Sequence, residues 1–252
     1  MAEVICITGA TSGFGLACAR KFANDNDVEL LLIGRREERL QQLVQSLPGK
    51  VQTFSFDVRN AEAIDQFART LTDSNTQVDV LINNAGLALG TEPADQASLE
   101  DWNTMVDTNI KGLMHMTHAL LPQMVDRNKG HIINLGSIAG SWPYPGGNAY
   151  CATKAFVEQF SRCLRADLLG KHIRVSNIAP GLAETEFSLV RMKGDKAKAD
   201  ALYNDTQALT PEDIAEIIYW TVKLPAHINI NHLEVMPTCQ AWGPLNIDKT
   251  MV

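Results

Sequence analysis

The sequence predicts a single α/β domain, in which a doubly wound parallel sheet of about seven strands has helices on both faces. Short apolar runs alternate with longer amphipathic stretches from one end of the chain to the other, a pattern typical of such sheets. Most of these runs are continuously apolar, as in strands that are covered on both faces. No internal repeat, low-complexity tract or linker interrupts residues 1–252, and this length suits one large domain.

The expected strands are separated by segments long enough for right-handed crossover helices. They are Val4–Thr8, Glu29–Ile33, Val51–Phe56, Val80–Asn83, His131–Leu135, Arg174–Ile178 and Leu233–Met236. Two helices have clear starting points. One begins at Thr210, a good N-cap that is followed by Pro211 and two acidic residues. Another begins at Ser98, with Asp101 three residues later.

The segment Glu184–Gln207 departs from this regular pattern, because it is polar and contains the charged run Arg191–Lys196. Long irregular insertions in compact domains often form lids or binding loops. We therefore expect a substrate loop or lid at about residues 184–207. A solvated surface helix is the alternative, and for the lysines of this segment it is the better interpretation.

Charge and cysteine content argue against several classes of protein. The chain has 22 Lys and Arg against 29 Asp and Glu, a net charge of -7, whereas a nucleic-acid-binding protein needs a concentrated basic surface. Its five scattered cysteines include no CxxC pair, which favours reduced thiols over disulfides or a zinc site. The N-terminal apolar run is too short for a signal peptide, and no stretch approaches a membrane span. We expect a cytoplasmic protein with no metal and no nucleic-acid or membrane partner.

A glycine-rich segment follows the first expected strand directly. It reads Thr8-Gly9-Ala10-Thr11-Ser12-Gly13-Phe14-Gly15 and leads into a helical pattern. Its three glycines permit a tight turn and a close approach of the backbone to a pyrophosphate, and the helix that begins there offers unpaired N–H groups. Three glycines in seven residues also occur in plain loops, but the position between strand and helix favours dinucleotide binding.

The second expected strand ends in Gly34, Arg35 and Arg36, about twenty residues beyond the glycines. An NAD site has an acidic residue in this region, which binds the ribose 2′-hydroxyl. Arginine instead pairs with a 2′-phosphate through charge-assisted hydrogen bonds, so the sequence predicts NADP as the cofactor. Arg36 has an alternative interpretation as the start of an exposed helix, and Arg35 is the stronger candidate.

A possible catalytic group consists of Ser137, Tyr150 and Lys154. Tyr150 and Lys154 are four residues apart and therefore share one face of a helix. A nearby cation favours the phenolate, so Lys154 is expected to lower the tyrosine pKa from its ordinary value of about 10. Such a tyrosine can remove a hydroxyl proton or return it to a carbonyl oxygen. Ser137 ends the fifth expected strand, where open α/β sheets bind ligands, and its hydroxyl can hold the reacting oxygen.

Each of these signals is weak alone, but in combination the sequence resembles the short-chain dehydrogenase/reductase family over essentially its whole length. The resemblance rests on the glycine segment, Asp57-Val58, Asn83-Asn84-Ala85-Gly86, Asn109, Ser137, Tyr150 to Lys154 and Pro180-Gly181, in this order. It implies a Rossmann-like fold.

The resemblance also implies roles for individual residues. Asn109 is expected to hold a water relay to Lys154, which also contacts the nicotinamide ribose. The implied cofactor-binding residues are Gly9, Thr11, Ser12, Gly13, Phe14, Gly15, Arg35, Arg36, Asp57, Val58, Asn84, Ala85, Gly86, Tyr150, Lys154, Pro180, Gly181 and Thr185. Among them, Asp57 and Val58 flank the adenine.

Narrower features are similar to those of the NADP-dependent 3-hydroxy acid dehydrogenases, which include serine and allo-threonine dehydrogenases. The similar segments are Gly86–Gly90, Ser141–Asn148, Glu186–Arg191 and Leu209–Asp213. This similarity implies reversible oxidation of the hydroxyl group beta to a carboxylate, which gives a 3-oxo acid. It also implies a homotetramer.

A 3-hydroxy acid needs a partner for its carboxylate, and Arg191 is the candidate because arginine binds carboxylates in a bidentate way. An ordinary surface arginine is an equally good interpretation of this residue. Two other functions remain open. One is an NADPH-dependent reductase of aldehydes or diketones, and the other is a non-catalytic NADPH-binding sensor or scaffold. The presence of all four residues Asn109, Ser137, Tyr150 and Lys154 argues against a sensor.

Overall fold

A seven-stranded parallel sheet forms the centre of the computed structural model, which describes residues 2–243 and 247. Its strands are β1 (Glu3–Thr8), β2 (Val28–Gly34), β3 (Lys50–Ser55), β4 (Val80–Asn83), β5 (Gly130–Leu135), β6 (Ile173–Pro180) and β7 (His232–Val235). Their order is β3-β2-β1-β4-β5-β6-β7, and every neighbouring pair is parallel. The predicted fold class is confirmed, and each expected strand begins and ends within two residues of an observed one.

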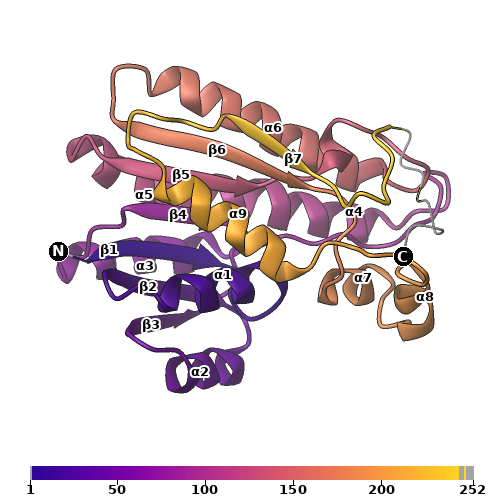
Figure 1. The fold of residues 1–252 in the computed structure, drawn as a ribbon, viewed down its shortest axis with the longest axis horizontal. Coiled ribbons are helices and arrows are strands. Elements are labelled where there is room, and N and C mark those ends of the chain that lie inside the picture. The colour runs from indigo at the N-terminus through magenta and orange to yellow at the C-terminus, as the bar shows by residue number, and fades with distance from the viewer. Residues whose placement is uncertain (1, 244–246, 248–252) are drawn as a thin grey trace.

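Helices cover both faces of this sheet (Figure 1). They are α1 (Gly13–Ala23), α2 (Glu37–Ser46), α3 (Ala61–Asp73), α4 (Leu99–Val106), α5 (Leu113–Asp126), α6 (Asn148–Asp167), α7 (Glu186–Arg191), α8 (Lys196–Ala201) and α9 (Pro211–Lys223). Buried side chains of α1, α2 and α9 pack with the strands in one hydrophobic cluster. Those of α3, α5 and α6 form a second cluster on the opposite face. The inner strands are therefore buried on both sides, which explains their apolar runs, whereas the edge strands β3 and β7 are only partly buried.

The order of the strands places a crevice beside β1 and β4. The chain moves outward from β1 to β2 and β3, and then returns across the sheet to continue from β4 in the opposite direction. In open α/β sheets ligands bind at this switch point, beyond the carboxyl ends of the strands. The segments that follow β1, β4, β5 and β6 meet there (Figure 1).

Both predicted helix starts are confirmed. Thr210 caps α9 through its side chain, which accepts from the backbone N–H of Asp213, and the Asp213 carboxylate accepts in return from the N–H of Thr210 at 2.8 Å. Ser98 caps α4 by accepting from the N–H of Asp101 at 3.3 Å. These caps satisfy N–H groups that the first turn of a helix leaves unpaired.

The helix that contains Asn109 has a feature that the sequence pattern did not indicate. Between α4 and α5 the chain forms a π-helix, Asp107–Gly112, without leaving the helical conformation. Such wide turns are rare and frequently occur at functional sites. Within residues 2–243 and 247, no helix is both long and apolar enough to cross a membrane.

Candidate active site

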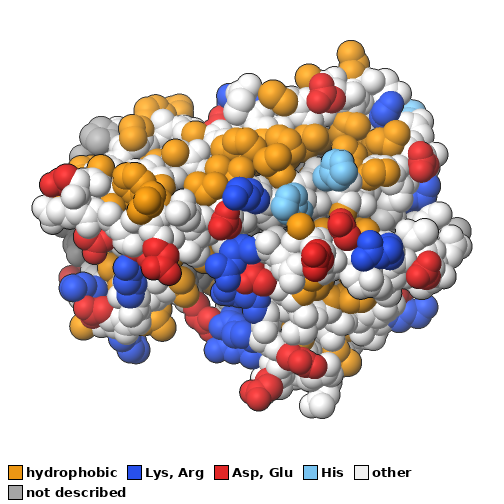
Figure 2. All heavy atoms as spheres, turned by 180° about the vertical axis from the view of Figure 1, so that it is seen from behind, with side chains coloured by type: hydrophobic (Ala, Val, Ile, Leu, Met, Phe, Trp, Pro, Cys, Tyr) orange, Lys and Arg blue, Asp and Glu red, His pale blue; other side chains and the backbone are white. Residues whose placement is uncertain are grey.

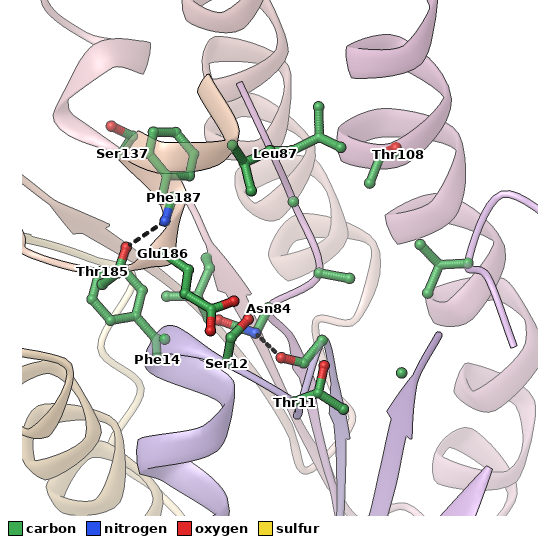
Figure 3. A pocket seen from close by; sticks show the side chains of 18 of the residues that line it. Thr11, Ser12, Phe14, Asn84, Leu87, Thr108, Ser137, Thr185, Glu186 and Phe187 are labelled. Carbon is green, nitrogen blue, oxygen red and sulfur yellow. Dashed lines mark hydrogen bonds between the residues drawn. The ribbon is translucent and has the colours of Figure 1, made fainter. Parts of the chain in front are cut away.

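A cleft opens at the carboxyl ends of the strands and contains nearly all of the predicted cofactor residues. Its lining includes Gly9, Thr11–Phe14, Arg35, Arg36, Asp57, Val58, Asn84–Gly86, Ser137, Tyr150, Lys154, Pro180, Gly181 and Thr185. In Figure 3, Ser137 and Phe187 lie at one end of this cleft and Thr11 at the other, with Asn84 between them. Three predicted site residues, Gly15, Asn109 and Arg191, are not part of the lining.

The glycine segment forms the tight turn that its sequence predicts. Gly9 has a φ of +67°, and a Cβ atom at this position would lie 2.9 Å from Asn84 Nδ2 and 3.0 Å from Ala85 Cα. A Cβ on Gly15 would collide with the Gly9 carbonyl oxygen. Asn84 closes the turn by donating from Nδ2 to Thr8 O at 2.9 Å. Gly15 thus acts through packing, which allows helix α1 to begin directly beneath the turn.

The N-terminus of α1 suits an anion such as a pyrophosphate. Ser12 stands at the N-cap, but its side chain accepts no capping hydrogen bond, and the first turn has no acidic residue. The N–H groups at the start of a helix therefore face the cleft with the positive end of the helix dipole. Together with the close approach that Gly9 permits, this geometry fits the phosphate groups of a dinucleotide.

The two predicted phosphate-binding arginines differ in their contacts. Arg35 has a side chain that is 62% exposed, and its only ion pair among the described residues is with Asp57 at 3.5 Å. Arg36 is held more firmly, because its Nε donates to Thr11 Oγ1 at 3.0 Å and its Nη1 donates to Glu186 at 2.9 Å. The Arg35 guanidinium is therefore the more available of the two for a ligand in the cleft.

Sequence reasoning missed the partner of Arg36. Glu186, the first residue of α7, also accepts from Arg39 Nη1 at 2.8 Å. Burial favours the protonated form of the Glu186 carboxyl, but the hydrogen bonds and charges of Arg36 and Arg39 outweigh burial and lower its pKa. These ion pairs join α7 to the second strand-helix unit. Because the paired residues are about 150 positions apart in the chain, no local sequence pattern indicates the contact.

Tyr150 and Lys154 lie on one face of α6, as their spacing predicts. Both residues are buried, and Lys154 Nζ is 5.8 Å from the centroid of the Tyr150 ring. Lys154 Nζ also donates to Leu135 O, at the end of β5, at 2.7 Å. Ser137 follows the same strand, where its hydroxyl accepts from Ala139 N at 3.1 Å, and its proximity to the Tyr150 phenol favours the phenolate. The three candidate catalytic side chains are thus placed together at the end of β5.

The predicted direction of the Tyr150 pKa shift is wrong for the protein chain by itself. Burial is the largest influence and raises the pKa of Tyr150 above its ordinary value, while the nearby Ser137 hydroxyl and the Arg191 charge only partly offset it. Burial also lowers the pKa of Lys154 to about 8. Attraction between a phenolate and an ammonium group favours both charged forms. Loss of solvation on burial opposes both charged forms, and here it is the larger effect.

Asn109 lies on the π-helix, behind the cleft lining. Its Oδ1 accepts from Leu87 N at 2.9 Å, and its Nδ2 donates to Leu87 O at 2.8 Å and to Thr153 Oγ1 at 3.0 Å. A Cβ on Gly86 would lie 3.3 Å from Asn109 Oδ1 and 3.6 Å from Lys154 Nζ. Gly86 therefore lies close to both polar groups, and a side chain at this position would crowd Asn109.

The Arg191 guanidinium, at the C-terminal end of α7, lies beside the rings of Tyr150 and Tyr144. Its guanidinium carbon is 5.9 Å from the Tyr150 ring centroid and 5.2 Å from that of Tyr144. Nη1 donates to Tyr144 Oη at 2.9 Å, and Nε donates to Gly90 O at 3.2 Å. Phe187, from the same helix, packs against Tyr150 with ring centroids 5.5 Å apart. Helix α7 thus brings one cationic and one aromatic side chain to the Tyr150 ring.

Several cleft residues were absent from the predicted set. They include Leu87, Thr108, Glu186, Phe187 and Val190. The last three belong to α7, so the predicted loop at 184–207 was a usable signal for their location. Leu87 lies within the Gly86–Gly90 segment that the sequence analysis singled out. Thr108 directly precedes Asn109, and this adjacency was its sequence signal.

Known proteins resemble this chain over nearly its whole length. The short chain dehydrogenase family matches residues 3–195. NADP-dependent 3-hydroxy acid dehydrogenase YdfG of Salmonella typhi is 55% identical over 248 residues, which cover 98% of this chain and 100% of that protein. Sulfoacetaldehyde reductase 2 of Chromohalobacter salexigens is 53% identical over 252 residues, or 99% of this chain and 100% of that protein.

Solved structures show the same relationship. The closed form of serine dehydrogenase complexed with NADP+ has a TM-score of 0.94 and 54% sequence identity, with 97% of this chain and 99% of that chain covered. Serine dehydrogenase from Escherichia coli has a TM-score of 0.83 and 49% sequence identity, with 95% of this chain and 100% of that chain covered.

Proposed function

The chain belongs to the short-chain dehydrogenase family, and we propose that it oxidises the hydroxyl group of 3-hydroxy acids, such as serine and allo-threonine, to 3-oxo acids with NADP+ as hydride acceptor. The reaction is reversible. The relatives described above support both the enzyme class and the cofactor. The family resemblance that the motifs indicate is therefore confirmed.

One observation carries the substrate class, namely the Arg191 guanidinium beside Tyr150. A 3-hydroxy acid has its hydroxyl carbon two bonds from the carboxylate carbon, so one small molecule can reach both residues. The Arg191 guanidinium carbon lies 5.9 Å from the Tyr150 ring centroid, so the cation stands beside the tyrosine ring. Arginine matches a carboxylate in geometry as well as charge. We infer that Arg191 binds the carboxylate while Tyr150 faces the hydroxyl.

In the proposed reaction the catalytic residues handle the proton. Tyr150 accepts the proton of the substrate hydroxyl, and Ser137 holds the reacting oxygen by a hydrogen bond. Bound NADP+ supplies the acceptor for the hydride. Lys154 stabilises the phenolate by its charge. We propose that a water near Asn109 and Lys154, both of which lie close to Gly86, completes the predicted proton relay.

A second candidate substrate class has a sulfonate in place of the carboxylate. A relative with nearly the same identity is a sulfoacetaldehyde reductase. In sulfoacetaldehyde, one CH₂ group separates the aldehyde carbon from the sulfonate. In the same way, one CH₂ group separates the aldehyde carbon of a simple 3-oxo acid from its carboxylate. An arginine can pair with either anion. The same placement of Arg191 and Tyr150 therefore fits reduction of sulfoacetaldehyde to 2-hydroxyethanesulfonate.

Neutral carbonyl reduction and cofactor sensing remain the alternatives, and a substrate panel separates them from the proposal. We expect NADP+ reduction, followed at 340 nm, with serine, allo-threonine, 3-hydroxypropionate and 3-hydroxybutyrate, but little with simple alcohols. The panel includes 2-hydroxyethanesulfonate, and NADPH oxidation with aldehydes and diketones is measured in parallel. Turnover of neutral carbonyls alone would contradict the anionic substrate class. Tight NADPH binding without any turnover would support the sensor.

Replacement of Arg191 by methionine tests the anion partner directly. We expect the KM for 3-hydroxybutyrate to rise by about 10- to 100-fold, the effect typical of losing a hydrogen bond to a charged group. The KM for its methyl ester, which keeps the hydroxyl but lacks the charge, is expected to stay within about twofold, since no charge-assisted bond is lost. Equal losses for acid and ester would show that Arg191 supports the site without binding the carboxylate.

Cofactor selectivity is expected to depend on Arg35. An Arg35→Ser variant should have a KM for NADP+ that is raised about 10-fold or more, because a charge-assisted hydrogen bond to the 2′-phosphate is lost. The KM for NAD+ should change little. Arg59→Ser is the matched control, since Arg59 pairs with the same Asp57 carboxylate but does not line the cleft. A variant whose NADP+ and NAD+ constants rise together would exclude this role for Arg35.

The predicted lid at residues 184–207 is part of the proposal. Helices α7 and α8 stand apart from the two main helical layers, at the end of the molecule where the cleft opens (Figure 1). Glu186, Phe187 and Val190 line the cleft, while Arg36 and Arg39 hold the start of α7. We propose that this segment covers the bound substrate and excludes water during the reaction.

A homotetramer and a cytoplasmic location complete the proposal. Figure 2, which views the face opposite to that of Figure 1, shows a broad band of hydrophobic side chains. Large exposed hydrophobic patches mark interaction surfaces, and exposed Met114 of α5 and the half-buried Phe156 and Phe160 of α6 belong to the helices on this side. Light scattering should give the molar mass of four chains. All five cysteines are free, which agrees with a reducing compartment.

A further inference from the structure

The hydrogen bonds that hold the Arg191 guanidinium group determine which of its N–H donors are available for an anionic substrate. The guanidinium group has five N–H donors. Nε donates to Gly90 O, and one hydrogen of Nη1 is used by Tyr144 Oη. No described residue accepts a hydrogen bond from Nη2. The two contacts therefore fix the plane of the guanidinium group and leave one amino group available for an anion.

Both anchors lie on loops that are tied to each other. Tyr144 begins a turn that closes when Gly147 N donates to Tyr144 O at 3.0 Å. Gly146 within this turn has a φ of +75°, and a Cβ there would collide with the Thr91 carbonyl. Asn148 Nδ2 donates to Glu92 O at 3.1 Å. The Tyr144 turn thus packs directly on the loop that carries Gly90.

Arg191 joins helix α7 to this pair of loops by both its backbone and its side chain. Gly90 N donates to Arg191 O at 3.0 Å, and Arg191 Nε donates back to Gly90 O. The Tyr144 phenol, which accepts a hydrogen bond from Nη1, then fixes the position of the rest of the guanidinium group. Burial raises the pKa of Tyr144, so at neutral pH the phenol is uncharged and can accept from Arg191 without neutralising its charge.

From this geometry we propose that Tyr144 is a positioning residue that determines specificity for acidic substrates, because it holds the Arg191 guanidinium toward the reacting carbon. The proposal rests on the proposed function. A phenol is well suited to the task. A carboxylate at position 144 would form an ion pair with Arg191 and compete with the substrate anion, whereas a phenylalanine would leave Nη1 without its acceptor.

A Tyr144→Phe variant tests the proposal, because it keeps the ring and removes only the hydroxyl. We expect the KM for 3-hydroxybutyrate to rise about 10-fold, with kcat and the KM for the methyl ester each within about twofold. In an Arg191→Met background the same substitution should change neither constant further, since Tyr144 acts through Arg191. Tyr219→Phe, on the outer helix α9, is the control for loss of a phenol hydroxyl.

The outcomes separate this inference from the proposed function. If the unmodified enzyme oxidises neither 3-hydroxy acids nor 2-hydroxyethanesulfonate, the proposed function fails. If it oxidises 3-hydroxybutyrate and Tyr144→Phe leaves its KM unchanged, the inference alone is overturned. Equal losses with acid and ester, or a further loss in the Arg191→Met background, would also overturn it. When the sulfonate is the better substrate, the same comparison is made with 2-hydroxyethanesulfonate and its neutral methyl ester.

Discussion

Replacement of Tyr150 by phenylalanine is expected to lower kcat by a factor of about 10² to 10⁴, the usual range for loss of a general acid or base. The variant keeps the ring that packs against Phe187 and loses only the hydroxyl that faces Ser137. Fold and NADP+ affinity should therefore change little. The loss of kcat is measured by steady-state kinetics with 3-hydroxybutyrate. Cofactor binding is measured by titrating the protein with NADPH and following the fluorescence of the cofactor.

Tyr219→Phe again provides the matched control. Its hydroxyl donates to Asp25 Oδ2 at 3.3 Å, and the residue does not line the cleft. We expect kcat for this variant to match that of the unmodified enzyme. A Tyr150→Phe variant that keeps more than about a tenth of the original kcat would mean that another group transfers the proton, since general acid–base catalysis contributes at least about 10².

Replacement of Lys154 by methionine is expected to remove most of the turnover and to make the chain more stable at neutral pH. The ammonium group is buried, and burial lowers its pKa from 10.5 to about 8. At neutral pH the folded protein therefore keeps Lys154 protonated although burial disfavours its charged form. Below pH 8 the folded state bears the full cost, about 3 kcal/mol at about 1.4 kcal/mol per pKa unit.

Methionine avoids this cost but loses the hydrogen bond from Nζ to Leu135 O, which contributes about 1 kcal/mol. The free energy of unfolding at pH 7 should accordingly rise by about 1–3 kcal/mol. As pH increases from 8 to 10.5, Lys154 loses its proton in the folded protein and the difference between the two proteins should shrink. Urea unfolding of both proteins at pH 7 and pH 10 measures this dependence. A less stable variant at pH 7, or a difference that grows with pH, would contradict the argument.

The fold could be predicted almost completely because local and global signals agree in this chain. Strands such as β1 and β4 are continuously apolar, since helices cover both sides of the sheet. The Thr210 cap marks its helix as clearly in the sequence as in the structure. Most of the cleft was predictable for a related reason. The turn at Gly9 and the end of β5 are short local motifs that line the same cleft, so recognising one of them in the sequence supported the other.

What could not be predicted depends on contacts between distant segments or on opposing effects. The pairing of Arg36 and Arg39 with Glu186 joins segments that no local pattern relates. The anchorage of Arg191 on Tyr144 and Gly90 is of the same kind. For Tyr150 the sequence identified the charged neighbour, but only the structure shows how deeply the phenol is buried. The sign of the pKa shift depends on which of these effects is larger.

The wide helical turn at Asp107–Gly112 makes the length of this segment as important as its composition. An α-helix advances about 100° per residue, whereas the π-turn accommodates one residue more. Asn109 and the buried stripe of α5 (Met116, Leu120 and Met124) can therefore face their separate partners although they belong to one continuous helix. Removal of a single residue from this turn would restore the ordinary helical phase. It would thereby rotate the residues of α4 relative to those of α5.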